Sequence, residues 1–203
     1  MLDALRYGLA LSVVAIAPGV FLFWFSIHPL IAFWRRLGPR RTLVLHTAAA
    51  VLLAVPVVWS RGWLLRIEFG TRPAIVVLGV VVIGCAAWLR LEINRAIPAT
   101  VLSGVPELAP GESQQLLVIT GIYGRIRHPR YVQMTAVFLG YALLCNYLAA
   151  YVVFLLSIPW AWSVALLEDR ELHDRFGAEF ERYAAQVPRF LPSRPRPAPH
   201  MTG

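Results

Sequence analysis

The sequence predicts an all-α, polytopic membrane protein with five transmembrane helices, and two observations support this fold class. Hydrophobic residues make up 58% of the 203 residues and charged residues only 15%, whereas soluble domains are about 45–50% apolar and ~25% charged. In addition, four long stretches contain no Asp, Glu, Lys or Arg: residues 7–34, 42–60, 73–89 and 131–167. This composition excludes a disordered chain and a large multidomain enzyme, and it favours a single membrane domain.

The first three apolar stretches are each long enough for one membrane crossing, because a hydrocarbon core of ~30 Å takes ~20 helical residues. The first stretch is too long for the apolar region of a signal peptide, so we expect it to be retained. Its Pro18-Gly19 and His28-Pro29 pairs are expected to kink this helix or to place its end at the membrane interface.

The fourth apolar stretch must fold back on itself. A single helix over residues 131–167 would be ~55 Å long at a rise of 1.5 Å per residue, which exceeds the membrane core. Its polar midpoint is Cys145-Asn146-Tyr147. We therefore expect two short helices, 131–145 and 148–167, joined in a tight hairpin.

Beyond this hairpin, the sequence predicts an amphipathic cytosolic helix over residues 168–187. Apolar residues recur there at helical spacing, and Pro188 ends the pattern. Glu168 falls on the same face as the apolar residues, whereas Asp169 is expected to point elsewhere. The face is formed by Leu172, Phe176, Phe180, Tyr183 and Val187.

We divide the chain into an N-terminal three-helix scaffold (1–95), a core (96–192) and a proline-rich tail (193–203) that we expect to be disordered. Prolines rule out a continuous helix over residues 96–120. The net charge is +8, and all 19 basic residues are Arg. Because these Arg residues lie between apolar stretches, they indicate the positive-inside rule and not a nucleic-acid partner. Four of them are in loop 35–41, which predicts an N-terminus outside and a C-terminus in the cytoplasm of a bacterial inner membrane.

The densest polar cluster is residues 120–131, just before the fourth apolar stretch. It is either a basic belt that meets lipid phosphates or an anion-binding site at a helix N-terminus, with His128 at the cap. Glu168 needs a partner at the end of a membrane helix, either an Arg of residues 125–130 or a cationic ligand. His28 and His46 have no acidic neighbour in the sequence and are interpreted as structural.

Several other side chains are assigned on spacing alone. Cys85 and Cys145 have no second Cys or His at metal-ligand spacing, so we expect packing roles and no metal site. Trp160 and Trp162 belong to an aromatic belt or line a channel for a lipid tail.

The second half of the chain, about residues 113–192, resembles the isoprenylcysteine carboxyl methyltransferases, a group that extends to phospholipid methyltransferases. The resemblance depends on six motifs in order. They are Gly121-Ile122-Tyr123, Arg127-His128-Pro129-x-Tyr131, Cys145-Asn146, Glu168-Asp169, Phe176-Gly177-Ala178-Glu179-Phe180-x-x-Tyr183 and Val187-Pro188-Arg189.

This resemblance implies an integral membrane methyltransferase that uses S-adenosyl-L-methionine and acts on a lipophilic or amphiphilic small molecule or a lipidated substrate from the bilayer. His128 is the candidate catalytic base if the acceptor is an amine. Val164 stands where members specific for prenylcysteine carry an Arg, which leaves the acceptor open. The cofactor-binding residues implied by the resemblance are Gln115, Leu116, Leu117, Val118, Tyr123, His128 and Glu168.

Two other functions fit parts of the pattern. Membrane sterol reductases share a similar His-Pro-x-Tyr motif but bind NADPH. A membrane accessory protein that kept the fold and lost catalysis is the second alternative.

Overall fold

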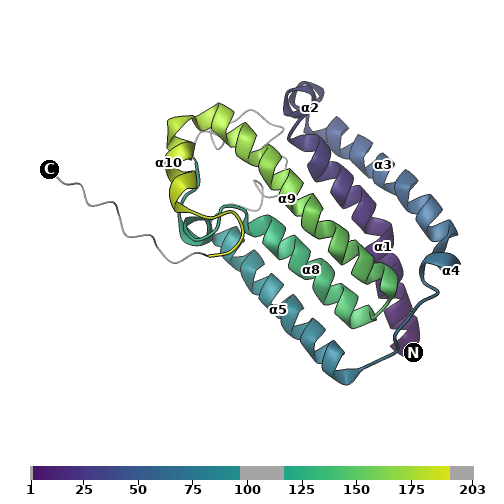
Figure 1. The fold of residues 1–203 in the computed structure, drawn as a ribbon. Coiled ribbons are helices and arrows are strands. Elements are labelled where there is room, and N and C mark those ends of the chain that lie inside the picture. Colours follow the sequence, from purple (N-terminus) through teal and green to yellow (C-terminus); the bar gives the residue numbers. More distant parts are fainter. Residues whose placement is uncertain (1, 97–116, 193–203) are drawn as a thin grey trace.

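A computed structural model describes residues 2–96 and 117–192, and every named element in these ranges is a helix (Figure 1), which confirms the all-α class. The predicted cofactor residues Gln115 and Leu116 and the tail 193–203 lie outside the described residues. The elements are α1 (Leu2–Ile27), α2 (Ile31–Leu37), α3 (Pro39–Trp59), α4 (Arg61–Leu64), α5 (Pro73–Ala96), the 3₁₀ helix η2 (Gly121–Gly124), α8 (Pro129–Cys145), α9 (Leu148–Phe176) and α10 (Ala178–Gln186).

Four of these helices, α1, α3, α5 and α9, are long and apolar enough to cross a membrane. The sequence led us to expect five crossings, but α8 has only 17 residues. Large apolar side chains such as Val44, Leu52, Val77 and Leu155 are exposed on the outside of the bundle. An outer surface of this kind is typical of a protein surrounded by lipid.

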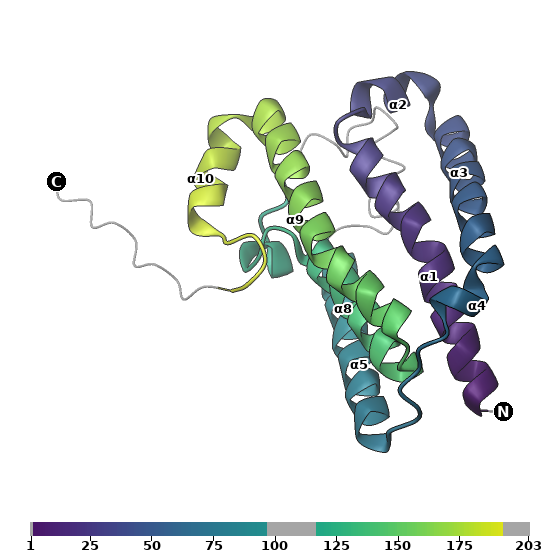
Figure 2. The ribbon, with the colours of Figure 1, turned by 45° about the vertical axis from the view of Figure 1, so that its right-hand side comes forward.

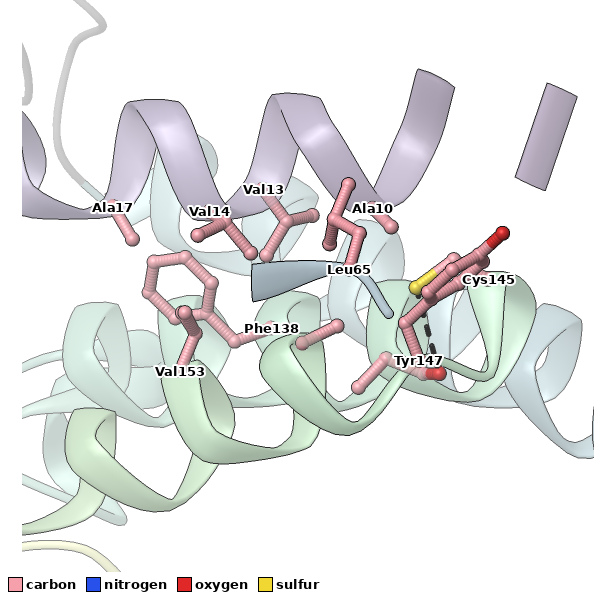
Figure 3. Close-up of a cluster of buried hydrophobic side chains, with 11 residues drawn as sticks. Ala10, Val13, Val14, Ala17, Leu65, Phe138, Cys145, Tyr147 and Val153 are labelled. Atoms are coloured by element: carbon pink, nitrogen blue, oxygen red, sulfur yellow. Dashed lines mark hydrogen bonds between the residues drawn. The ribbon is translucent and has the colours of Figure 1, made fainter. Parts of the chain in front are cut away.

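Helix α8 is the central element of the bundle. It packs between α5 on one side and α1 and α9 on the other, and α3 covers the outer side of α1 (Figures 1 and 2). The main core joins Ala10, Val13 and Ala17 of α1 to Phe138 of α8 and Val153 of α9 (Figure 3). Small residues along α1 allow the backbones to approach closely, which is the usual basis of helix association in membranes.

The chain reverses direction between α8 and α9, where the sequence has Cys145-Asn146-Tyr147. Asn146 has a φ of 56° in the left-handed region, which Asn tolerates better than most residues. The buried Arg6 of α1 donates from Nε to the carbonyl oxygen of Cys145 at 3.1 Å. Its positive charge therefore lies at the negative end of the α8 dipole.

One helix boundary falls where the sequence indicated a break, and another does not. The first apolar stretch divides at the His28-Pro29 pair, because α1 ends at Ile27 and α2 begins at Ile31. Residues 168–187 do not form one helix: α9 continues to Phe176, and α10 begins only at Ala178. Gly177 separates the two with a φ of 52°, a conformation that Gly adopts without steric cost and that the apolar spacing does not encode.

Candidate active site

The described part of the predicted site, around η2 and the start of α8, lies toward α10 and away from the N-terminus (Figure 1). After α10 the chain folds back, and its backbone runs beside the residues that precede α8. The amide of Arg127 donates to the carbonyl of Pro188 at 2.8 Å, and the amide of His128 donates to that of Arg189 at 3.0 Å. The Tyr183 hydroxyl donates to the Tyr123 carbonyl at 2.8 Å. The C-terminal segment thus fixes the entrance to α8.

His128 lies just before α8 and is buried between two carboxylates. Its Nδ1 is 3.2 Å from Oε2 of Glu168, and its Nε2 is 2.8 Å from Oδ1 of Asp169. Burial alone would lower the pKa of His128, but the hydrogen bonds to Asp169 and Glu168 outweigh it and raise the pKa to about 8. Both ring nitrogens therefore donate, and the imidazole carries a positive charge at neutral pH.

Asp169 is the centre of an ion cluster, so the prediction that it points elsewhere is wrong. The ion cluster is formed by Arg127, His128, Glu168, Asp169 and Arg189. Its Oδ2 accepts from Nη1 of Arg127 at 3.0 Å and from Nε of Arg189 at 2.7 Å, while its Oδ1 faces His128. The prediction failed because it considered only which face of the helix packs on the bundle. Glu168 and Asp169 lie about 100° apart around α9, and the His128 ring reaches both of them.

The structure gives Glu168 a hydrogen-bond partner that the sequence analysis had not named, and Arg130, one of the Arg residues that it had named, also interacts with the Glu168 charge. The hydrogen bond is to His128, whereas Arg127 of the 125–130 cluster binds Asp169. The Glu168 side chain keeps 22% of its surface exposed, compared with 9% for Asp169. Glu168 is therefore the more accessible of the two carboxylates.

His28, interpreted as structural from the sequence, has an acidic neighbour after all. Its Nδ1 is 2.9 Å from Oε2 of Glu171, and its Nε2 is 3.1 Å from the Tyr131 hydroxyl. Arg35 of α2 lies 3.8 Å from the other oxygen of Glu171. Glu171 is 143 positions from His28, so no local motif shows the contact. One sequence feature could have indicated a role for Glu171. It follows Glu168 by about one helical turn, which places both carboxylates on the same side of α9.

The remaining predicted cofactor residues lie on the approach to α8. Val118 and Tyr123 pack against Leu89 and Ile93 at the end of α5, and Leu117 is half-buried. Tyr123 is also tied through its carbonyl to Tyr183 of α10. The structure therefore brings His128 and Glu168 into direct contact and places Val118 and Tyr123 in an adjoining cluster.

Two cavities flank the ion cluster. A cleft of about 640 Å³ between α9 and α10 is lined by Arg127, Asp169, Arg189 and Phe180 among others. An apolar cavity of about 540 Å³ lies between α8 and α9, with Tyr131, Trp162 and Phe190 in its wall. Trp162 thus lines a cavity.

Trp160, the other candidate for a lipid-tail channel, is buried in the bundle. Its ring stacks on Phe21 with 4.9 Å between centroids, and its Nε1 donates to the Phe21 carbonyl at 3.1 Å. We therefore assign Trp160 to packing between α1 and α9.

The described part of the chain thus combines a buried ion cluster, an adjacent apolar cavity and an apolar outer surface. The family model described as phospholipid methyltransferase matches residues 74–179, which is more than half of the chain. The chain belongs to this family of membrane methyltransferases, in agreement with the resemblance found in the sequence. No curated protein and no solved structure matches the chain.

Proposed function

We propose that the protein is an S-adenosyl-L-methionine-dependent methyltransferase that methylates a lipophilic or amphiphilic acceptor at the cytoplasmic side of a bacterial inner membrane. The observation that carries the proposal is the contact of His128 with Glu168 and Asp169 next to an apolar cavity. Family membership supports methyl transfer as the reaction.

The residues present suit a donor that bears a sulfonium, an ammonium and a carboxylate. Nε of Arg127 is buried and has no hydrogen-bond partner within residues 2–96 and 117–192, and the Arg127 side chain belongs to the wall of the cleft between α9 and α10. A buried donor of this kind favours an anionic group. Glu168 offers a partly exposed carboxylate for an ammonium or for ribose hydroxyls, and the Tyr123 ring suits a cation.

We assign Leu117, Val118, Tyr123, His128 and Glu168 to the cofactor site, with Gln115 and Leu116 from the preceding segment. When bound, the cofactor supplies a methyl group on a cationic sulfur. The protein's contribution is to position the acceptor and to keep water out. His128 holds the two carboxylates in place, and its proton makes it a poor base in this arrangement.

The acceptor chain fits the apolar cavity between α8 and α9. The cavity lies beside Arg189 and His128, because the Phe190 ring in its wall is 6.0 Å from the His128 ring. An amphiphile would place its chain there and its polar group at the ion cluster. Val164 is fully buried and apolar, so it offers no charge to hold a prenylcysteine carboxylate.

We further propose that α8 is a fifth crossing, in addition to the four longer helices. Its 17 residues reach the lower limit for a spanning helix, and it is covered by α5, α1 and α9. Five crossings would put the two termini on opposite sides of the membrane, and the four Arg of loop 35–41 favour a cytoplasmic C-terminus and ion cluster.

Ligand binding to the purified protein in detergent tests the function. We expect S-adenosylhomocysteine to bind and Glu168→Gln to weaken binding by about tenfold or more, because a charge-assisted hydrogen bond is lost. Glu179→Gln, on the exposed face of α10, is the matched control and should bind like the wild type. Binding of NADPH alone would instead support a reductase, and binding of neither ligand would support an accessory protein.

A further inference from the structure

A second hydrogen-bonded chain begins at the Tyr131 hydroxyl. It runs from the Tyr131 hydroxyl to Nε2 of His28 at 3.1 Å and from Nδ1 of His28 to Glu171 at 2.9 Å. Arg35 completes it at 3.8 Å from Glu171. The chain joins residues of α8, α9 and α2 to the residue that follows α1, and Tyr131 and His28 are both buried.

The order of these groups suits proton transfer. A carboxylate on Nδ1 favours the imidazole tautomer with its proton on that nitrogen, which leaves the lone pair on Nε2 facing the Tyr131 hydroxyl. Tyr131 can then pass its own proton to His28 as its oxygen takes up another. The Glu171 carboxylate stabilises the imidazolium that forms, and Arg35 orients Glu171.

Tyr131 also lies at the right place to meet an acceptor. It is part of the wall of the apolar cavity between α8 and α9, and its ring is 5.8 Å from the His128 ring. Trp24 and Trp160 hold the Tyr131 ring edge-on from two sides. By contrast, both nitrogens of His128 are engaged by carboxylates, so His128 has no lone pair to offer.

We propose that Tyr131, backed by His28 and Glu171, takes the proton from an acceptor that reaches the site with an N–H or O–H bond. This inference rests on the proposed methyltransferase function and assigns the base within it. The acceptor N–H or O–H bond breaks, a new O–H bond forms on Tyr131, and the original Tyr131 proton moves to Nε2 of His28. The freed electron pair on the acceptor forms the bond to the methyl group, while the pair of the broken sulfur–methyl bond stays on sulfur.

The inference gives the N-terminal helices a role in the chemistry. His28 and Arg35 lie outside residues 74–179, the part that the family model matches, whereas Tyr131 and Glu171 lie inside it. The proton path therefore needs residues of the N-terminal scaffold in addition to those in the segment that the family model matches.

The test compares Tyr131→Phe with the wild type on two acceptors in vesicles that also carry the donor, S-adenosyl-L-methionine. One is a phospholipid with a primary amine headgroup, and the other is an S-prenylated cysteine with a free carboxylate, which has no proton to lose. We expect kcat for the amine to fall by about 100-fold, a typical contribution of general base catalysis. Affinity for S-adenosylhomocysteine should be unchanged, because Tyr131 is not among the residues assigned to the cofactor site. Tyr141→Phe, also on α8 but outside the proton path, is the matched control.

A second readout does not depend on turnover. Thermal unfolding of Tyr131→Phe, His28→Gln and the double variant should show non-additive shifts, because the two side chains share a hydrogen bond. Normal amine methylation by Tyr131→Phe would overturn the proposal, as would additive shifts. Methylation by the wild type of the carboxylate alone, or of neither probe despite binding of S-adenosylhomocysteine, would also overturn it. Failure of the wild type to bind S-adenosylhomocysteine would instead reject the proposed function itself.

Discussion

Asp169 and Glu168 are adjacent in the sequence but have different surroundings, and the two carboxylates should therefore respond differently to the same substitution. Asp169 accepts from Arg127, Arg189 and His128 and is nearly buried, whereas Glu168 accepts from His128 and is partly exposed. Removing one partner of a buried ion pair is costly because the remaining charges stay buried.

We expect Asp169→Asn to lower the free energy of unfolding by about 3 kcal/mol and Glu168→Gln by about 1 kcal/mol. Urea unfolding in detergent, followed by near-ultraviolet circular dichroism, measures both values. The order should reverse for affinity toward S-adenosylhomocysteine, with Glu168→Gln the weaker binder. Equal destabilisation by the two variants would contradict the central position of Asp169 in the cluster.

His128 makes stability depend on pH in a defined direction. Its pKa in the folded protein is about 8, above the value of ~6.5 for an unperturbed His. The folded state therefore binds the proton more tightly, so the stabilisation is fully present below pH 6.5 and is lost as the pH rises through 8. A shift of this size corresponds to about 2 kcal/mol.

Unfolding measurements between pH 6 and 9 should show this loss in the wild type, and His128→Gln should reduce it. The hydrogen bond to Glu181 also raises the pKa of His173 at the end of α9, but this pair is exposed and screened by solvent, so the matched control His173→Gln should change the slope much less than His128→Gln. If the free energy of unfolding of the wild type does not fall as the pH rises, the two carboxylates do not hold the proton on His128.

The residues of the site show what a sequence pattern can and cannot provide. His128 and Glu168 were identifiable because each stands in a short motif with a recognisable chemical character. The partners of His28 were not identifiable, because its contacts to Tyr131 and Glu171 join positions more than 100 residues apart. Such contacts depend on the packing angles of α1, α8 and α9, which no local spacing specifies.

Helix boundaries were predictable where polarity changes and not where only the backbone changes. The break between α8 and α9 coincides with Cys145-Asn146-Tyr147 because polar residues interrupt an apolar stretch there. The break between α9 and α10 lies within a continuous apolar pattern, and only the positive φ of Gly177 marks it. Hydrophobic periodicity does not reveal such a position, because it depends on side chains alone.

Gly177 should therefore control how α10 lies against the site. Gly177→Ala introduces a Cβ at a φ of 52°, which costs about 1 kcal/mol. We expect weaker S-adenosylhomocysteine binding, because Phe180 and Tyr183 of α10 contact Arg127 and Tyr123. Isothermal titration calorimetry would measure the change. The control is Gly8→Ala, where a Cβ meets nothing within 4 Å, and equal effects of the two would contradict the role of Gly177.

The contact between α5 and α8 depends on another glycine. A Cβ at Gly140 would lie 2.6 Å from Cδ1 of Ile83, so the two helices pack too closely for a larger residue without a shift. Gly140→Ala should destabilise the protein by about 1–3 kcal/mol, the usual cost of overpacking. Gly84→Ala on α5 faces open space and should not destabilise it. Thermal unfolding in detergent distinguishes the two, and similar melting temperatures would contradict close packing of α5 on α8.

At the scale of the whole molecule, polar and charged side chains concentrate at the two ends of an apolar bundle. The ion cluster, α2 and α10 lie at one end, and the N-terminus, α4 and the turn between α8 and α9 lie at the other (Figure 1). The loop 35–41, with four Arg, belongs to the end with the ion cluster. The positive-inside rule therefore supports the proposal that the site faces the cytoplasm.

This orientation predicts which residues a membrane-impermeant maleimide can reach in intact bacterial cells. In a background with Cys85→Ala and Cys145→Ala, Gly62→Cys on α4 should be labelled from outside, and Ala178→Cys on α10 should be labelled only after lysis. Both positions are exposed in the structure, so the difference reports the side of the membrane and not burial. Labelling of Ala178→Cys in intact cells would place the site outside, away from the cytoplasmic donor. Labelling of both positions from outside would mean an even number of crossings between α4 and α10, and α8 would then not span the membrane.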